Sequence, residues 1–167
     1  MILISSCLAG LATRYDGRDN YREEIASLVA QGKAVLACPE QLGGLATPRK
    51  PAEIVGGNGA DVLEGRAKVM TADGDDVTAE FVRGAEQTLT LARTVGAKYA
   101  VLKESSPSCG SELIYDGTFA KTKGPGFGVT AALLRRHGIE VFSEASFPSF
   151  LSKLREEERR SGEGVVR

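Results

Sequence analysis

The sequence predicts an α/β fold: a single Rossmann-like domain in which a mainly parallel sheet is flanked by helices. Four short apolar runs, at residues 2–6, 34–37, 99–102 and 139–142, have the length and composition of buried strands. Helical patterns alternate with these runs, which is typical of α/β proteins. Short joints connect the first strand, the first helix and the second strand, so we expect parallel strands joined by a right-handed crossover.

The first half of the chain is predicted to contain one helix and one long loop. Asn20 fits the N-cap of the helix, with Glu23 three positions later as a capping-box variant, and Gly32 ends it. Residues 39–65 are rich in Gly and Pro and are predicted to form a long loop, which in a compact domain is usually functional. A small strand and a turn are expected at residues 67–74.

The second half is predicted to continue the alternation of helices and strands. Its longest helix is capped by Asp76 or Thr78 and ends at Gly96. The later elements are a strand at 99–102, a short strand at 112–115, a helix at 129–134, a strand at 139–142 and a last helix from about Pro148. The predicted domain spans residues 1–160, and residues 161–167 are predicted to be a frayed or disordered tail.

The composition is ordinary for a soluble globular protein, with 42% hydrophobic and 26% charged residues in 167. The 21 basic and 22 acidic residues give a formal net charge of -1, which argues against a nucleic-acid partner that is bound through phosphates. No apolar run has transmembrane length, and the run before Cys7 is too short for a signal peptide. We therefore expect a cytoplasmic protein with reduced thiols and no membrane partner.

The three cysteines, Cys7, Cys38 and Cys109, each stand where a predicted strand gives way to a loop. Because the carboxyl ends of parallel strands share one edge of the sheet, the three thiols are expected to meet there as a ligand set. Any single cysteine could instead be a small buried hydrophobe. Their spacing does not fit a zinc knuckle, and His137 is expected to end a helix. Three thiolates without a fourth protein ligand favour an open metal centre containing zinc or iron and sulfur.

Other candidate residues surround the cysteines in the sequence. Glu40 lies two positions after Cys38 and is either a general acid–base beside a metal or a solvated loop carboxylate. Ser105, Ser106 and Ser108 precede Cys109 and either offer hydroxyls to a ligand or form turns. A glycine-rich run at 124–128 leads into a helix, and it is either an anion or carbonyl cradle or a simple turn.

Several ordered motifs together identify a family resemblance that covers residues 2–145. The motifs are Ser6-Cys7-Leu8-Ala9-Gly10, Tyr15-Asp16-Gly17, Cys38-Pro39-Glu40, Leu42-Gly43-Gly44-Leu45, Thr47-Pro48-Arg49, Ser106-Pro107-Ser108-Cys109-Gly110, Ile114-Tyr115-Asp116-Gly117 and Gly128-Val129-Thr130-Ala131-Ala132. The chain thus resembles the thiouracil desulfidase family, in particular its short single-domain members.

The resemblance implies a 4Fe–4S cluster held by Cys7, Cys38 and Cys109, with one open iron for the thiocarbonyl sulfur of a thiolated pyrimidine. It also implies that Glu40 activates water or shuttles protons, that Ser106 assists, and that the reaction needs no net redox change. The substrate would be a free thiobase or thionucleotide. The substrate-binding residues predicted on this basis are Tyr15, Asp16, Lys103, Ser105, Gly128, Val129 and Thr130.

Two other functions are compatible with the same residues. A cluster with an open iron could also serve sulfur insertion or trafficking, with sulfide as a donor. A non-catalytic metal-binding or redox-sensing module would use the cysteines but would not need Glu40 or a substrate pocket. The oligomeric state is left open by the sequence.

Overall fold

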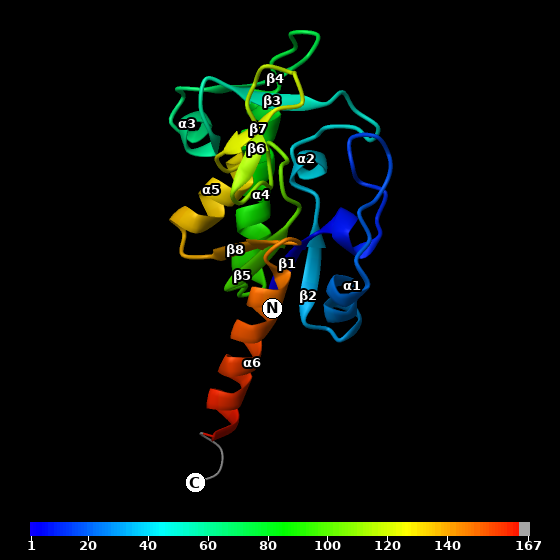
Figure 1. Cartoon of the computed structure of the whole chain (residues 1–167), viewed down its shortest axis with the longest axis vertical. Coiled ribbons are helices and arrows are strands. Elements are labelled where there is room, and N and C mark those ends of the chain that lie inside the picture. The colour runs from blue at the N-terminus through cyan, green and yellow to red at the C-terminus, as the bar shows by residue number, and fades with distance from the viewer. Residues whose placement is uncertain (164–167) are drawn as a thin grey trace.

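A parallel sheet of four strands lies at the centre of the computed structural model, which describes residues 1–163 (Figure 1). The strands are β1 (Ile2–Ser5), β2 (Ala34–Ala37), β5 (Tyr99–Leu102) and β8 (Glu140–Ser143), in the order β2-β1-β5-β8. Every neighbouring pair is parallel. The predicted α/β class and parallel sheet are confirmed, and the strand order is new information.

Helices cover both faces of this sheet. On one face, α1 (Glu23–Ala30) and α6 (Phe147–Glu163) pack against a cluster that includes Ile4 and Val101. On the other, α4 (Thr78–Thr94) and α5 (Val129–Arg136) pack against Leu3 and Leu102. Because successive side chains of a strand point to opposite faces, a strand covered on both sides needs a continuous apolar run. This explains why each strand of the sheet is visible in the sequence.

Residues 39–65 are not the structureless loop that the sequence suggested. They contain α2 (Pro39–Leu42), β3 (Ala52–Val55) and α3 (Gly59–Leu63), and β3 pairs antiparallel with β4 (Lys68–Thr71). Glycine and proline are dense here because the elements are short. The capping box of α3 is a local signal that could have revealed it, since Asn58 Oδ1 accepts from Ala60 N and Asp61 Oδ2 accepts from Asn58 N, both at 2.9 Å.

A second antiparallel ribbon is formed by β6 (Leu113–Tyr115) and β7 (Lys123–Pro125). The two ribbons lie together beyond the end of the main sheet toward which β2 points (Figure 1). A third apolar cluster joins them to the helices, with Ile54 of β3, Ile114 of β6 and Val129 of α5 among its members. The ribbons therefore cover the carboxyl edge of the parallel sheet.

The ends of three helices differ from the prediction. The N-cap of helix α4 is Val77, which is neither of the two predicted residues, Asp76 and Thr78. Helix α1 begins at Glu23 with Arg22 as its N-cap, so Asn20 does not cap it. Helix α6 continues to Glu163, past the predicted boundary at 160, and residues 164–167 of the predicted tail lie outside the described residues. Within residues 1–163, no helix has both the length and the apolar character that crossing a membrane requires.

Helix α2 is seated on α4 through two glycines that allow the backbones to touch. A Cβ at Gly84 would lie 1.9 Å from the carbonyl oxygen of Pro39, and a Cβ at Gly43 would lie 1.9 Å from that of Glu80. Real Cβ atoms do not approach oxygen this closely, so any side chain here would move α2 away from α4. The two glycines therefore fix the position of α2, which carries Glu40.

Candidate active site

The three cysteines come together at the carboxyl edge of the parallel sheet. Cys7 follows β1 within the short 3-10 helix η1 (Ser6–Ala9), Cys38 follows β2, and Cys109 lies in the loop after β5. These three strands are neighbours in the sheet, and all three residues line one cavity of about 740 Å³. None of them forms a disulfide. The predicted convergence of the thiols is therefore found in the structure.

The spacing of the thiols bears on the kind of metal that they could hold. Within residues 1–163, no group of three His, Cys, Asp or Glu side chains is close enough to bind a single metal ion. In an iron–sulfur cluster each thiolate binds a different iron atom, so its ligands stand farther apart than the ligands of one ion. Three soft thiols around one cavity are a donor set that fits an iron–sulfur cluster.

Burial makes two of these thiols poor nucleophiles. It raises the pKa of Cys7, although a hydrogen bond from the Asn20 side chain (Nδ2–Sγ 3.5 Å) acts in the opposite direction. Burial raises the pKa of Cys109 to about 12, and the negative charges of Glu40 and Cys38 act in the same direction. Thiolates in this position need a compensating positive charge, which bound metal ions provide.

The loop that carries Cys109 is held by the first turn of α5. Gly128 N donates to Gly110 O (2.8 Å), Val129 N to Pro107 O (2.9 Å) and Thr130 N to Ser108 O (2.9 Å). The sequence suggested that Gly128, Val129 and Thr130 contact the substrate. The structure does not place them in the cavity lining, and their N–H groups are taken up by the Cys109 loop.

Two carboxylates fix the start of the same loop. The Glu104 carboxylate accepts hydrogen bonds from Ser111 N and Oγ, both at 2.8 Å, and from three further backbone N–H groups. Burial alone would raise the pKa of Glu104, but these bonds outweigh it and lower the pKa. Glu144 in turn accepts from Glu104 N (2.8 Å) and pairs with Lys103 Nζ (2.7 Å). Lys103 lines the cavity, and its carboxylate partner is Glu144, not Glu104.

Glu40 stands in the first turn of α2 and faces the cavity with little access to solvent. Only 12% of its side chain is exposed, so it is not a solvated loop carboxylate. Its Oε2 accepts from Arg49 at 2.5 Å, and its Oε1 lies 3.5 Å from Ser106 Oγ. Ser106 Oγ accepts from Ser108 N (3.0 Å) and Cys109 N (3.1 Å), so its own proton is directed away from the loop. The structure thus brings both predicted catalytic side chains to the cavity.

The remaining predicted site residues divide into two groups. Tyr15 and Ser105 line the cavity. Asp16 does not line it, and its carboxylate pairs with Arg14 at 2.9 Å. Asn20, which was expected to cap a helix, instead directs its amide to Cys7.

Two features of the cavity were missed by reasoning from the sequence. Arg49 belongs to a motif that carries the family resemblance, but no spacing rule links it to Glu40. The second feature is the charge at the β6–β7 ribbon. Six cationic side chains line the cavity, and four of them have carboxylate partners. Lys121 and Lys123 have none within the described part of the chain, and Lys123 Nζ lies 5.4 Å from the centre of the Tyr115 ring.

Comparisons with known proteins place this chain among relatives that are similar over most of its length. The sequence model of the 2-thiouracil desulfurase family matches residues 2–146. The uncharacterized protein YbbK of Bacillus subtilis (strain 168) is 56% identical over 144 residues, which cover 86% of this chain and 95% of YbbK. The solved structure of the 4Fe–4S-dependent thiouracil desulfidase TudS is similar with a TM-score of 0.81 and 46% identity, covering 92% of this chain and 96% of that one.

Proposed function

This chain belongs to the 2-thiouracil desulfurase family, and we propose that it is an iron–sulfur-dependent desulfidase that converts a thiolated pyrimidine to its oxo form and sulfide. The observation that carries the proposal is the cavity itself. Three free thiols from adjacent strands open into it, and a largely buried carboxylate, Glu40, faces the same space beside Ser106. Its similarity to TudS supports the same function.

In this proposal Cys7, Cys38 and Cys109 hold a 4Fe–4S cluster that has one iron without a protein ligand. When bound, the cluster supplies a Lewis acid with affinity for soft sulfur, which polarises a C=S bond. The thiols must be reduced to serve as ligands, so we place the protein in the cytoplasm.

The chain's own residues supply the proton transfers. The net reaction is C=S plus water to C=O plus hydrogen sulfide, so no oxidant or reductant is consumed. Glu40 Oε1 is the carboxylate oxygen that Arg49 does not contact, and we assign it the proton of the attacking water. Ser106 is held by two backbone N–H groups and directs its hydroxyl proton toward that oxygen.

The rival functions explain less of the site. A metal-binding or redox-sensing module has no use for a carboxylate that is buried beside the thiols and bonded to a serine. Sulfur insertion would be the reverse reaction. It is distinguished by supplying sulfide and an unmodified pyrimidine and measuring whether the thiolated pyrimidine forms. We expect release of sulfur, because nothing but water is then required as a co-reactant.

Lys121 and Lys123 bear on which thiolated pyrimidine is bound. They line the cavity from the β6–β7 ribbon, and within the described residues no carboxylate neutralises them. A nucleoside monophosphate carries an anionic group at the opposite end from the thiocarbonyl, and lysine is a common phosphate ligand. We therefore propose a thionucleotide as the preferred substrate, ahead of the free base.

The test compares thiouracil with thiouridine 5′-monophosphate on anaerobically prepared protein. We expect both to release sulfide, and release from neither would refute the proposed function. Replacing Lys121 and Lys123 by Gln should raise KM for the nucleotide by roughly tenfold, about 1.4 kcal/mol, and leave the free base within a factor of about two. Lys33→Gln, an exposed lysine paired with Glu158, is the matched control for the change in charge. An equal change in KM for both substrates would show that the two lysines do not bind the phosphate.

A further inference from the structure

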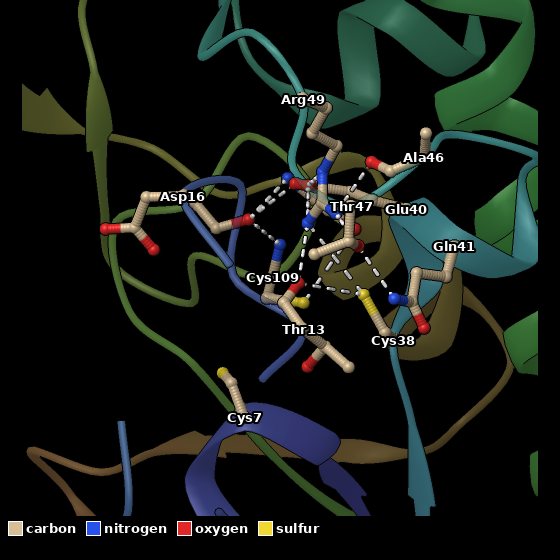
Figure 2. A network of polar contacts seen from close by, with 12 residues as sticks. Cys7, Thr13, Asp16, Cys38, Glu40, Gln41, Ala46, Thr47, Arg49 and Cys109 are labelled. Carbon is tan, nitrogen blue, oxygen red and sulfur yellow. Dashed lines mark hydrogen bonds and ion pairs between the residues drawn. The ribbon is translucent and has the colours of Figure 1, made fainter. Parts of the chain in front are cut away.

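Arg49 makes several side-chain hydrogen bonds at the cavity, and the proposed reaction does not yet use it. Only 9% of the side chain is exposed. Its guanidinium donates to Glu40 Oε2 (2.5 Å), to Thr13 O (2.8 Å) and to Thr47 Oγ1 (2.9 Å), and Nη2 lies 4.0 Å from Cys38 Sγ. Figure 2 shows the guanidinium between these groups, with Cys38 at its edge and Cys7 farther away. The side chain therefore joins three segments that border the cavity.

The geometry distinguishes the two oxygens of Glu40. Both Nε and Nη2 of Arg49 approach Oε2, each at 2.5 Å, whereas Oε1 is left to face Ser106 Oγ at 3.5 Å. A planar guanidinium with several fixed donors sets the rotation of a carboxylate, which a single ammonium group cannot do as well. The Arg49 backbone is itself fixed, because its N–H donates to Tyr15 O at 2.8 Å.

From this arrangement we propose that Arg49 is a positioning residue for the desulfidase reaction: it holds Oε2 of Glu40 so that Oε1 points at the reacting water. The inference rests on the proposed function, because it takes Glu40 as the proton-transfer group. Arg49 then acts through Glu40, and its contribution exists only while Glu40 carries a carboxylate. Thr13 O and Thr47 Oγ1 hold the guanidinium in the plane that this task requires.

A purely structural ion pair is the competing explanation. Breaking a buried pair leaves a charge without a partner, which is strongly destabilising, so loss of activity alone would not separate the two explanations. The two explanations differ in whether the effects of Arg49 and Glu40 on kcat are coupled. Residues that act as one unit give non-additive effects on kcat, whereas independent contributions add.

The experiment is a double-mutant cycle with Arg49→Gln and Glu40→Gln in anaerobically prepared protein. In the parental background Arg49→Gln should lower kcat by about 10- to 100-fold while KM changes by less than about threefold. In the Glu40→Gln background, Arg49→Gln should lower kcat by less than about a further threefold. Arg49→Lys should recover part of kcat, because lysine restores the positive charge but not the planar set of guanidinium donors. Arg66→Gln, which removes an exposed arginine paired with Asp61, is the matched control and should leave kcat unchanged.

Three readouts other than turnover complete the test: the thermal unfolding midpoint, the iron content and the crystal structure of Arg49→Gln. We expect parental iron content and a Glu40 carboxylate that has rotated away from Ser106. If Arg49→Gln does not fold, Arg49→Lys is carried through the same cycle and the same structure determination. Fully additive effects on kcat, or an unmoved Glu40 in the variant structure, would overturn the inference. Lack of sulfide release by the parental protein would instead count against the proposed function, and the structure of the variant would still decide the role of Arg49.

Discussion

Glu40→Gln is expected to lower kcat for desulfurisation by about a hundredfold or more, the usual scale for a positioned proton-transfer group. The amide keeps the size of the side chain and can still accept a hydrogen bond from Arg49, but it cannot take a proton from water. KM should change much less, because the thiocarbonyl sulfur is not held by the carboxylate. The measurement is sulfide release under anaerobic conditions, made after the iron content of the variant has been matched to that of the parental protein.

The control for this substitution is Glu64→Gln, which removes a half-exposed carboxylate that pairs with Arg136 away from the cavity. It should leave kcat unchanged. Turnover of Glu40→Gln within a few-fold of the parental value, at equal iron content, would remove Glu40 from the reaction. Ser106 and the other serines of the Cys109 loop would then be the next candidates.

Cys38→Ser is expected to abolish stable cluster binding and, with it, desulfurisation to the background rate. A serine hydroxyl is a harder ligand that stays protonated near neutral pH when it is free, so it binds the iron of a cluster much more weakly than a thiolate does. Two remaining thiolates are too few to hold a cubane cluster. Iron and acid-labile sulfide per chain, together with the visible absorbance of anaerobic protein, measure the loss.

Cys7→Ser and Cys109→Ser should behave in the same way, because all three thiols border the same cavity. A parental thermal unfolding midpoint of the metal-free variants would show that the substitutions do not act by unfolding the chain. Full iron loading and turnover of any one of the three variants would exclude that cysteine as an essential ligand. Stoichiometric zinc in an active, colourless parental protein would favour the zinc alternative.

The sheet and the position of the cysteines could be predicted because both depend on local patterns. A strand buried on both faces must be continuously apolar, and each cysteine either directly follows such a run or lies in the segment after it. Strand order could not be predicted, because it depends on pairings between distant segments that leave no local signal. The parallel rule alone was enough to bring Cys7, Cys38 and Cys109 to one edge.

The surroundings of the cysteines were harder to predict. The free N–H groups at the start of a helix indicate that an acceptor binds there, but not which one. In this chain the acceptors are carbonyls of the Cys109 loop, so Gly128, Val129 and Thr130 support that loop and do not line the cavity. Arg49 was missed for a related reason, since its contact with Glu40 across nine positions depends on the fold of the segment between them.

We propose that this chain releases sulfur from a thiolated pyrimidine by hydrolysis at an iron–sulfur cluster. The most direct test measures the oxo-pyrimidine and sulfide formed per substrate consumed by anaerobic, cluster-loaded protein without added reductant or oxidant, with metal-free and zinc-loaded protein assayed in parallel. We predict one oxo-pyrimidine and one sulfide for each substrate, in the cluster-loaded protein alone. Equal turnover by metal-free or zinc-loaded protein, or a requirement for an electron donor, would contradict this account.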